Sequence, residues 1–98
     1  MRWCCMVFRD TFQEAGQRGF AVFVARHELG QDVFVLQHRS AEPGDEANVK
    51  SASDLPVSLI SQLIISRCPW CGRKLADSYG RHLDDLRREE LFIRLGAT

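Results

Sequence analysis

The chain has 98 residues, 45% of them hydrophobic, and its 13 basic and 13 acidic side chains give a formal net charge of zero. This length allows one small domain with a modest hydrophobic core, so we expect a single domain over residues 1–98. The charge balance disfavours nonspecific nucleic-acid binding, which usually requires a basic excess. No apolar run reaches the roughly 18 residues that a membrane-spanning helix needs, so we expect no membrane association.

The N-terminal residues and the cysteine content predict a cytoplasmic protein. Residues 1–10 include basic side chains but no sustained apolar segment and no small-residue cleavage site, so we expect no secretion signal. The chain has four cysteines. In a reducing compartment, such cysteines are more often metal ligands than partners in disulfides.

The first half of the chain predicts a helix followed by a hairpin. Residues 5–15 have helical periodicity, and Gly16 is a suitable residue to end that helix. Residues 20–25 and 32–38 are rich in β-branched and aromatic side chains, which is typical of strands. Both strands are apolar on successive residues, which predicts cover on both faces of the sheet.

The second half predicts a loop, a third strand and a closing helix. Residues 40–54 are small, polar and turn-forming, and we expect a mobile loop there, with a functional loop as the alternative. Residues 62–67 predict a strand, and residues 79–95 predict a C-terminal helix that ends before Gly96. The expected fold is α+β: a small three-stranded antiparallel sheet with N- and C-terminal helices.

The most specific pattern in the chain is a cysteine pair at C-x₂-C spacing, in the stretch Cys68-Pro69-Trp70-Cys71-Gly72-Arg73-Lys74-Leu75. Two thiolates at this spacing are typical of a zinc knuckle, and proline stiffens the turn between them. Glycine after the second cysteine allows the positive-φ turn that directs backbone N–H groups toward sulfur. Structural zinc requires four ligands, so two more must come from elsewhere.

We expect Cys4 and Cys5, the other two cysteines of the chain, to complete the site. Adjacent side chains point to opposite sides of an extended strand, but at a turn into a helix both can reach one ion. The alternative ligand set replaces one of them with a histidine from His27, His38 or His82. A further alternative is that the cysteines are buried free thiols.

These cysteine-bearing segments resemble those of small uncharacterised bacterial proteins. The resemblance rests on Trp3-Cys4-Cys5-Met6 and on the segment from Ile65 to Leu75, which matches a C-P-W-C-G-x-K-L knuckle. It implies a zinc-ribbon-like fold in which Cys4, Cys5, Cys68 and Cys71 are the matching positions. Such proteins often have proline after the knuckle leucine, where this chain has Ala76, so we expect a different turn into the last helix. The resemblance implies no activity.

The sequence contains no Ser/His/Asp order, phosphate-binding glycine loop or HExxH-type helix, so we expect no enzymatic activity. The preferred function is a noncatalytic, zinc-stabilised binding or adaptor module of unknown pathway. The first alternative is a nucleic-acid-binding zinc ribbon, in which cations contact phosphates and tryptophans stack on bases. The residues for it would be Arg2, Trp3, Arg67, Trp70, Arg73 and Lys74. The same cations could instead offset the negative charge of a four-thiolate zinc site.

The less favoured alternative is a thiol oxidoreductase that uses Cys68 and Cys71, because C-P-W-C resembles the C-P-x-C motif of glutaredoxin-type enzymes. Only residues 72–98 follow the motif, which is too little chain for the βαβ fold that normally follows it. The one candidate for the later cis-proline, Pro56, precedes the motif.

The expected C-terminal helix has apolar residues on more than one side. Tyr79, Leu83, Leu86 and Ile93 form its predicted core-facing stripe, whereas Leu91, Phe92 and Leu95 lie away from that stripe. One interpretation is that the latter three contact a protein partner or a second copy of this chain. The other is that the helix bends near Glu89 and Glu90 and turns these residues inward.

Overall fold

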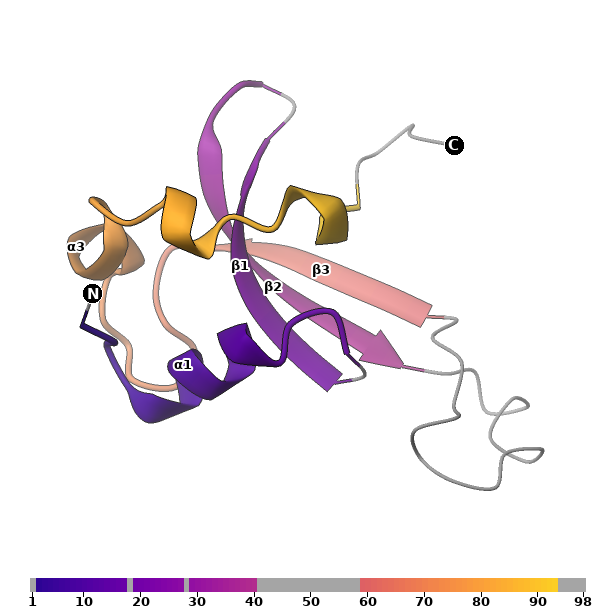
Figure 1. The fold of residues 1–98 in the computed structure, drawn as a ribbon, viewed down its shortest axis with the longest axis horizontal. Helices are drawn as coiled ribbons and strands as arrows, with labels where there is room; N and C mark the ends of the chain where they lie inside the picture. The colour runs from indigo at the N-terminus through magenta and orange to yellow at the C-terminus, as the bar shows by residue number, and fades with distance from the viewer. Residues whose placement is uncertain (1, 18, 28, 41–58, 94–98) are drawn as a thin grey trace.

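The computed structural model describes residues 2–17, 19–27, 29–40 and 59–93. The main elements are α1 (Met6–Gln13), β1 (Gly19–Arg26), β2 (Asp32–Ser40), β3 (Leu59–Ile65) and α3 (Leu75–Tyr79) (Figure 1). Two single 3₁₀ turns follow, η2 (Asp84–Leu86) and η3 (Glu89–Leu91). The predicted α+β class with a three-stranded antiparallel sheet is confirmed, and the expected loop after residue 40 lies outside the described residues.

The sheet is a meander in the order β1-β2-β3, and its register sorts the side chains onto two faces. Val22 is opposite Leu36, which is opposite Leu63, on one face. The next rung, Phe23–Val35–Ile64, faces the other way. β1 is buried from Ala21 to Ala25, so the prediction of cover on both faces is confirmed for this strand.

One face of the sheet carries the larger hydrophobic cluster. Phe8 from α1 packs there against Val22 and Val24, together with Cys68, Leu75, Tyr79 and Leu86. The helix presents Phe8 inward because the apolar positions of α1 recur at helical spacing, while Asp10 and Gln13 stay exposed. This cluster therefore joins α1, the sheet, the knuckle and α3 in one core.

The opposite face is covered by the C-terminal segment. Leu91 packs there against Ala21, Phe23, Ala25 and Val35. Buried Gln37 in β2 fixes this segment, because its side-chain amide donates to the Leu91 carbonyl over 2.7 Å and its oxygen accepts from Arg39 Nε over 2.8 Å. The amide also donates to Gln62 Oε1 over 3.2 Å.

The predicted helix over 79–95 is wrong over the part that the structure describes, residues 79–93. Helix α3 ends at Tyr79, and the chain is extended at Arg87, between the two 3₁₀ turns. There Arg88 N–H donates to the Val24 carbonyl over 2.9 Å, which gives the middle of the outer edge of β1 a backbone partner. Arg87 also pairs with Asp32 at 2.9 Å. These contacts outweigh local helix propensity, since an unpaired edge on a buried strand leaves polar backbone groups without partners.

The break in the helix also corrects the predicted core stripe. Tyr79 and Leu86 are buried as expected, but Ile93 is 47% exposed and Leu91 is only 9% exposed. Of the two interpretations of Leu91, contact with a partner or an inward turn after a bend, the structure shows the inward turn.

Replacing Gln37 with leucine should destabilise the fold. The change preserves most of the volume but removes the amide that binds the Leu91 carbonyl, and it takes from Arg39 its buried acceptor. We expect a loss of about 1–3 kcal/mol in the free energy of unfolding, measured by chemical denaturation. Gln13→Leu, on the exposed end of α1, is the matched control. Equal stability of the parent and Gln37→Leu would contradict this account.

Candidate metal centre

The structure brings all four cysteines to one point. Their four Sγ atoms lie within 4.8 Å of one another, and no other group of metal-binding side chains occurs among the residues that the structure describes. Cys68 is buried, Cys4 and Cys5 are half-buried, and Cys71 is exposed. The site therefore lies at the edge of the core, with one ligand facing solvent.

The knuckle is formed by a tight backbone turn. Gly72 N–H donates to the Cys68 carbonyl over 2.9 Å, and Cys68 N–H donates to the Arg73 carbonyl over 2.9 Å. Gly72 has φ of 78°, a conformation that other residues rarely adopt, so glycine is required at this position. The turn aims backbone N–H groups at the sulfurs of Cys68 and Cys71.

The N-terminal pair reaches the same point because the chain changes conformation there. Cys5 is the N-cap of α1, with extended φ and ψ of −160° and 164°, and its Sγ accepts a hydrogen bond from Phe8 N–H over 3.4 Å. The thiol thus takes the place that serine or aspartate usually occupies at a helix start. Cys4 precedes the cap, and its own N–H donates to the Tyr79 hydroxyl over 2.8 Å.

The spacing of the sulfurs fits a tetrahedral metal. Four sulfurs at about 2.3 Å from a zinc ion lie about 3.8 Å apart. Cys5 Sγ and Cys68 Sγ are 3.7 Å apart, and the other pairs remain within 4.8 Å. A small contraction of the site would place all four sulfurs at bonding distance, so these residues fit a four-thiolate metal centre.

The local environment shifts the pKa values of three of the thiols, and not all in the same direction. Burial raises the pKa of the Cys4 thiol to about 12, and burial also raises the pKa of Cys68. The backbone N–H of Arg73 lowers the pKa of exposed Cys71. A metal ion must therefore displace protons from the two more buried sulfurs, which a strongly Lewis-acidic ion such as zinc can do.

The three histidines do not join the four sulfurs. His82 pairs with Asp85 at 3.4 Å, the His38 ring packs 4.6 Å from that of Phe20, and His27 Nδ1 accepts from Leu29 N–H over 3.2 Å. Each has another environment, as solvated or satisfied histidines usually do. The geometry therefore favours the all-cysteine set over the alternative with one histidine.

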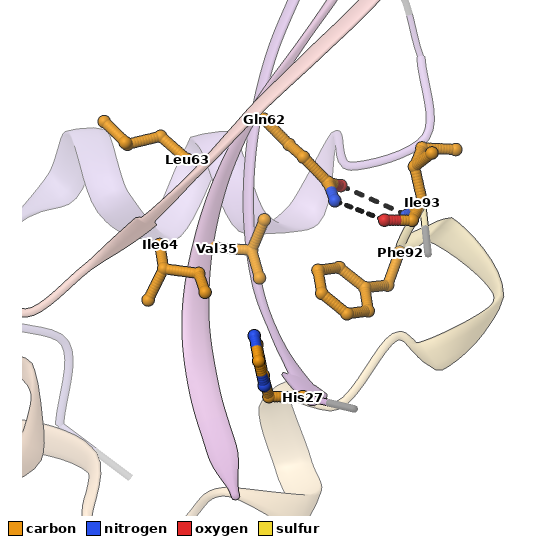
Figure 2. A pocket seen from close by; sticks show the side chains of 7 residues that line it. All are labelled: His27, Val35, Gln62, Leu63, Ile64, Phe92 and Ile93. Atoms are coloured by element: carbon orange, nitrogen blue, oxygen red, sulfur yellow. Dashed lines mark hydrogen bonds between the residues drawn. The ribbon is translucent and has the colours of Figure 1, made fainter. Parts of the chain in front are cut away.

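A separate cleft of about 440 Å³ lies on the opposite face of the sheet. Figure 2 shows His27 directed toward Val35 and Phe92, while the Gln62 side chain hydrogen-bonds the backbone of Ile93 above it. The rest of its lining comes from Leu63 and Ile64. Five of the seven lining residues are apolar, so the cleft presents a mainly apolar surface.

Comparisons with protein-family models, with curated proteins and with solved structures found no match for this chain. The resemblance to small zinc-ribbon-like proteins therefore stays a prediction. No helix in the described ranges has the length and apolar character needed to cross a bilayer.

Tyr79 is the residue of the site that the sequence did not reveal. Its place in the apolar stripe predicted a core position, which is correct, since the side chain is fully buried. Its hydroxyl contacts Cys4, which is 75 residues away along the chain. A tyrosine at a predicted core position does indicate a buried hydrogen-bond partner, since a buried tyrosine hydroxyl usually has one, but it does not identify that partner.

Single substitutions of the cysteines should separate ligands from bystanders. We expect Cys68→Ser and Cys71→Ser to abolish tight zinc binding, and Cys4→Ser and Cys5→Ser to weaken it strongly, because each removes one sulfur from the group. The measurement is zinc affinity by competition with a chromophoric chelator, with His82→Ala as the control. A variant Cys4→Ala that binds like the parent, beside a His82→Ala variant that does not, would overturn the four-cysteine set.

Proposed function

We propose that this chain binds one zinc ion through Cys4, Cys5, Cys68 and Cys71, and that the ion stabilises a noncatalytic binding module. The observation that carries the proposal is the convergence of four sulfurs within 4.8 Å. Structural zinc sites have four protein ligands, whereas catalytic zinc sites keep one position open for water or substrate. A full thiolate set leaves no such position.

The surroundings of the site support a structural role. Cys68 belongs to the main hydrophobic cluster, and Trp3, Cys4 and Cys5 pack against it. The segments that bear the ligands contain little regular structure of their own, apart from the isolated bridge between Arg67 and Lys74. An ion at this point would join the N-terminal segment to the knuckle, and thereby hold α1 against the sheet.

Removing the metal should loosen or unfold the protein. Apparent binding free energies of structural zinc are about 10–16 kcal/mol, which is comparable to or larger than the typical 5–15 kcal/mol stability of a whole domain. We expect the thermal unfolding midpoint of the purified protein to fall sharply after exhaustive chelation, and to recover when one equivalent of zinc is added. Full thermal stability with four free thiols after chelation would refute the structural role.

The binding surface of the module is proposed to lie at the outer edge of β3. Ile60 and Ile64 are 40% and 49% exposed on the face that carries Ile93, which is 47% exposed, and Leu63 is 63% exposed on the other face of the same strand. β3 contains no charged residue and no proline, the devices that usually protect an edge strand. Within the described ranges, no backbone outside β2 pairs with this strand. These exposed residues replace Leu91 as the expected contact, since Leu91 is buried in its own core.

The occupant we propose for this edge is a second copy of the chain, whose β3 would pair with it about a two-fold axis. Four partly exposed side chains offer much less apolar surface than the roughly 800 Å² per partner of a standard interface. The dimer is therefore expected to be weak. Phe92 contributes a wall of the adjoining cleft, while Leu95, named with it in the sequence-based prediction, lies outside the described residues.

Solution mass tests this dimer. We expect the parent to show a concentration-dependent mass in sedimentation equilibrium, and Leu63→Lys with Ile64→Lys to remain monomeric, because edge lysines oppose strand pairing. Leu29→Lys changes a side chain that is 80% exposed elsewhere in the molecule, and it serves as the control. A parent that is monomeric at high concentration, or a dimer that survives the double substitution, would exclude this surface.

Nucleic-acid binding is the second candidate, and one observation favours it. Trp70 is 40% exposed at the knuckle, and Arg67, Arg73 and Lys74 nearby are exposed as well. Trp3 does not belong to this surface, because its ring packs against Phe12 and Tyr79. Salt-dependent retention on a single-stranded DNA column that disappears in Trp70→Ala would support this candidate over the protein-binding one.

Thiol oxidoreductase activity has less support. The first cysteine of the motif, Cys68, is 2% exposed. Such enzymes place an accessible thiolate at the start of a helix, whereas here Gly72 and the Arg73–Lys74 turn separate the motif from α3.

A further inference from the structure

Tyr79 is held in one orientation by aromatic rings from three other parts of the chain. Its ring stacks on that of Phe8 in α1, with centroids 4.8 Å apart and an interplanar angle of 18°. The rings of Trp3 and Phe34 lie 6.1 and 6.3 Å away. The side chain is fully buried, so its hydroxyl cannot turn to bulk solvent.

The hydroxyl is directed at Cys4. Its oxygen accepts the Cys4 backbone N–H over 2.8 Å. A phenol also has one hydrogen to donate, and a buried donor without an acceptor costs free energy. Burial raises the pKa of the Tyr79 hydroxyl, and the neighbouring Cys4 thiol raises it further, which places this thiol beside the hydroxyl proton. Leu75 and Leu86 of the same cluster offer the hydroxyl no acceptor.

The other three sulfurs already have backbone donors. Cys5 Sγ accepts from Phe8 N–H at the start of α1. Cys68 and Cys71 face the backbone N–H groups of the knuckle, those of Trp70 and Cys71 for the former and that of Arg73 for the latter. Cys4 precedes the helix cap and lies outside the knuckle, and within the described ranges only side chains, Tyr79 among them, act as hydrogen-bonding neighbours of its thiol. Tyr79 is the one of these that is not itself a proposed ligand.

We propose that Tyr79 is a positioning residue of the metal centre: its hydroxyl donates a hydrogen bond to the Cys4 thiolate and fixes that ligand in the coordination sphere. This inference rests on the proposed zinc site. Hydrogen bonds to metal-bound ligands set their orientation and tune their donor strength, and bonds to an ionised acceptor are stronger than neutral ones. A residue of the hydrophobic core thereby positions Cys4, the ligand that belongs to neither the knuckle nor the helix cap.

The test uses Co²⁺ as a spectroscopic substitute for zinc in the reduced full-length protein. Tyr79→Phe removes only the hydroxyl. We expect a Co²⁺ affinity roughly 10–100-fold weaker than that of the parent. We also expect the sulfur-to-cobalt charge-transfer band to move to longer wavelength, because a thiolate that loses a hydrogen bond becomes a better electron donor. The visible bands of tetrahedral cobalt should remain.

Phe8→Leu is the matched control, because it disturbs the same stacked core without removing a polar group. It should lower stability and leave the charge-transfer energy unchanged, which separates positioning from packing. A second modification keeps both the ring and the hydroxyl. The chain has a single tyrosine, so growth on 3-fluorotyrosine labels Tyr79 alone and makes its hydroxyl a stronger donor, and the band should then move to shorter wavelength.

The possible failures are distinguishable. If the parent gives no tetrahedral cobalt spectrum, the proposed metal site itself fails. If the parent binds cobalt normally while Tyr79→Phe and the fluorotyrosine protein keep its affinity and band position, the metal site stands and the role of Tyr79 is overturned. A band shift of equal size in Phe8→Leu would also overturn it, since packing alone would then explain the effect.

Discussion

Four thiols meet within 4.8 Å at the edge of this small core, although they come from opposite parts of the chain. As thiolates they would repel one another, and burial already raises the pKa of two of them. In the proposed metal centre, a divalent cation would convert this repulsion into bonding and would join residues 4–5 to residues 68–71. Helix α1, the knuckle and the stacked rings of Phe8 and Tyr79 pack together around this meeting point.

The second constraint is the edge of β1. That strand is buried on both faces, so its outer backbone groups need partners within the protein. The C-terminal segment supplies one for the Val24 carbonyl through Arg88 N–H. Gln37 fixes the same segment on the sheet face opposite α1 by binding the Leu91 carbonyl. β3 at the other edge has no such cover within the described ranges, which is why the proposed contact with a second chain is placed there.

The sequence was most informative where local pattern and tertiary structure agree. The runs of β-branched residues predicted the strands around Val22 and Val35. The C-x₂-C spacing predicted that Cys68 and Cys71 lie together at the candidate metal site. The sequence was misleading over residues 79–93, because helical periodicity there competes with an edge-pairing opportunity that is invisible until β1 is placed. That adjacent Cys4 and Cys5 both reach the site depends on the extended conformation of the cap residue. The contact of Tyr79 with Cys4 depends on the assembled core, so neither could be read from spacing.

The measurement that tests the central claim most directly is X-ray absorption at the zinc edge of protein purified without added metal. The account predicts one zinc per chain, surrounded by four sulfur neighbours at about 2.3 Å with no nitrogen or oxygen in the first shell. A first shell that contains a histidine nitrogen or a water oxygen would contradict the four-cysteine assignment. Protein that contains no metal after such purification, yet is fully folded, would contradict the claim that the ion holds the two cysteine pairs together.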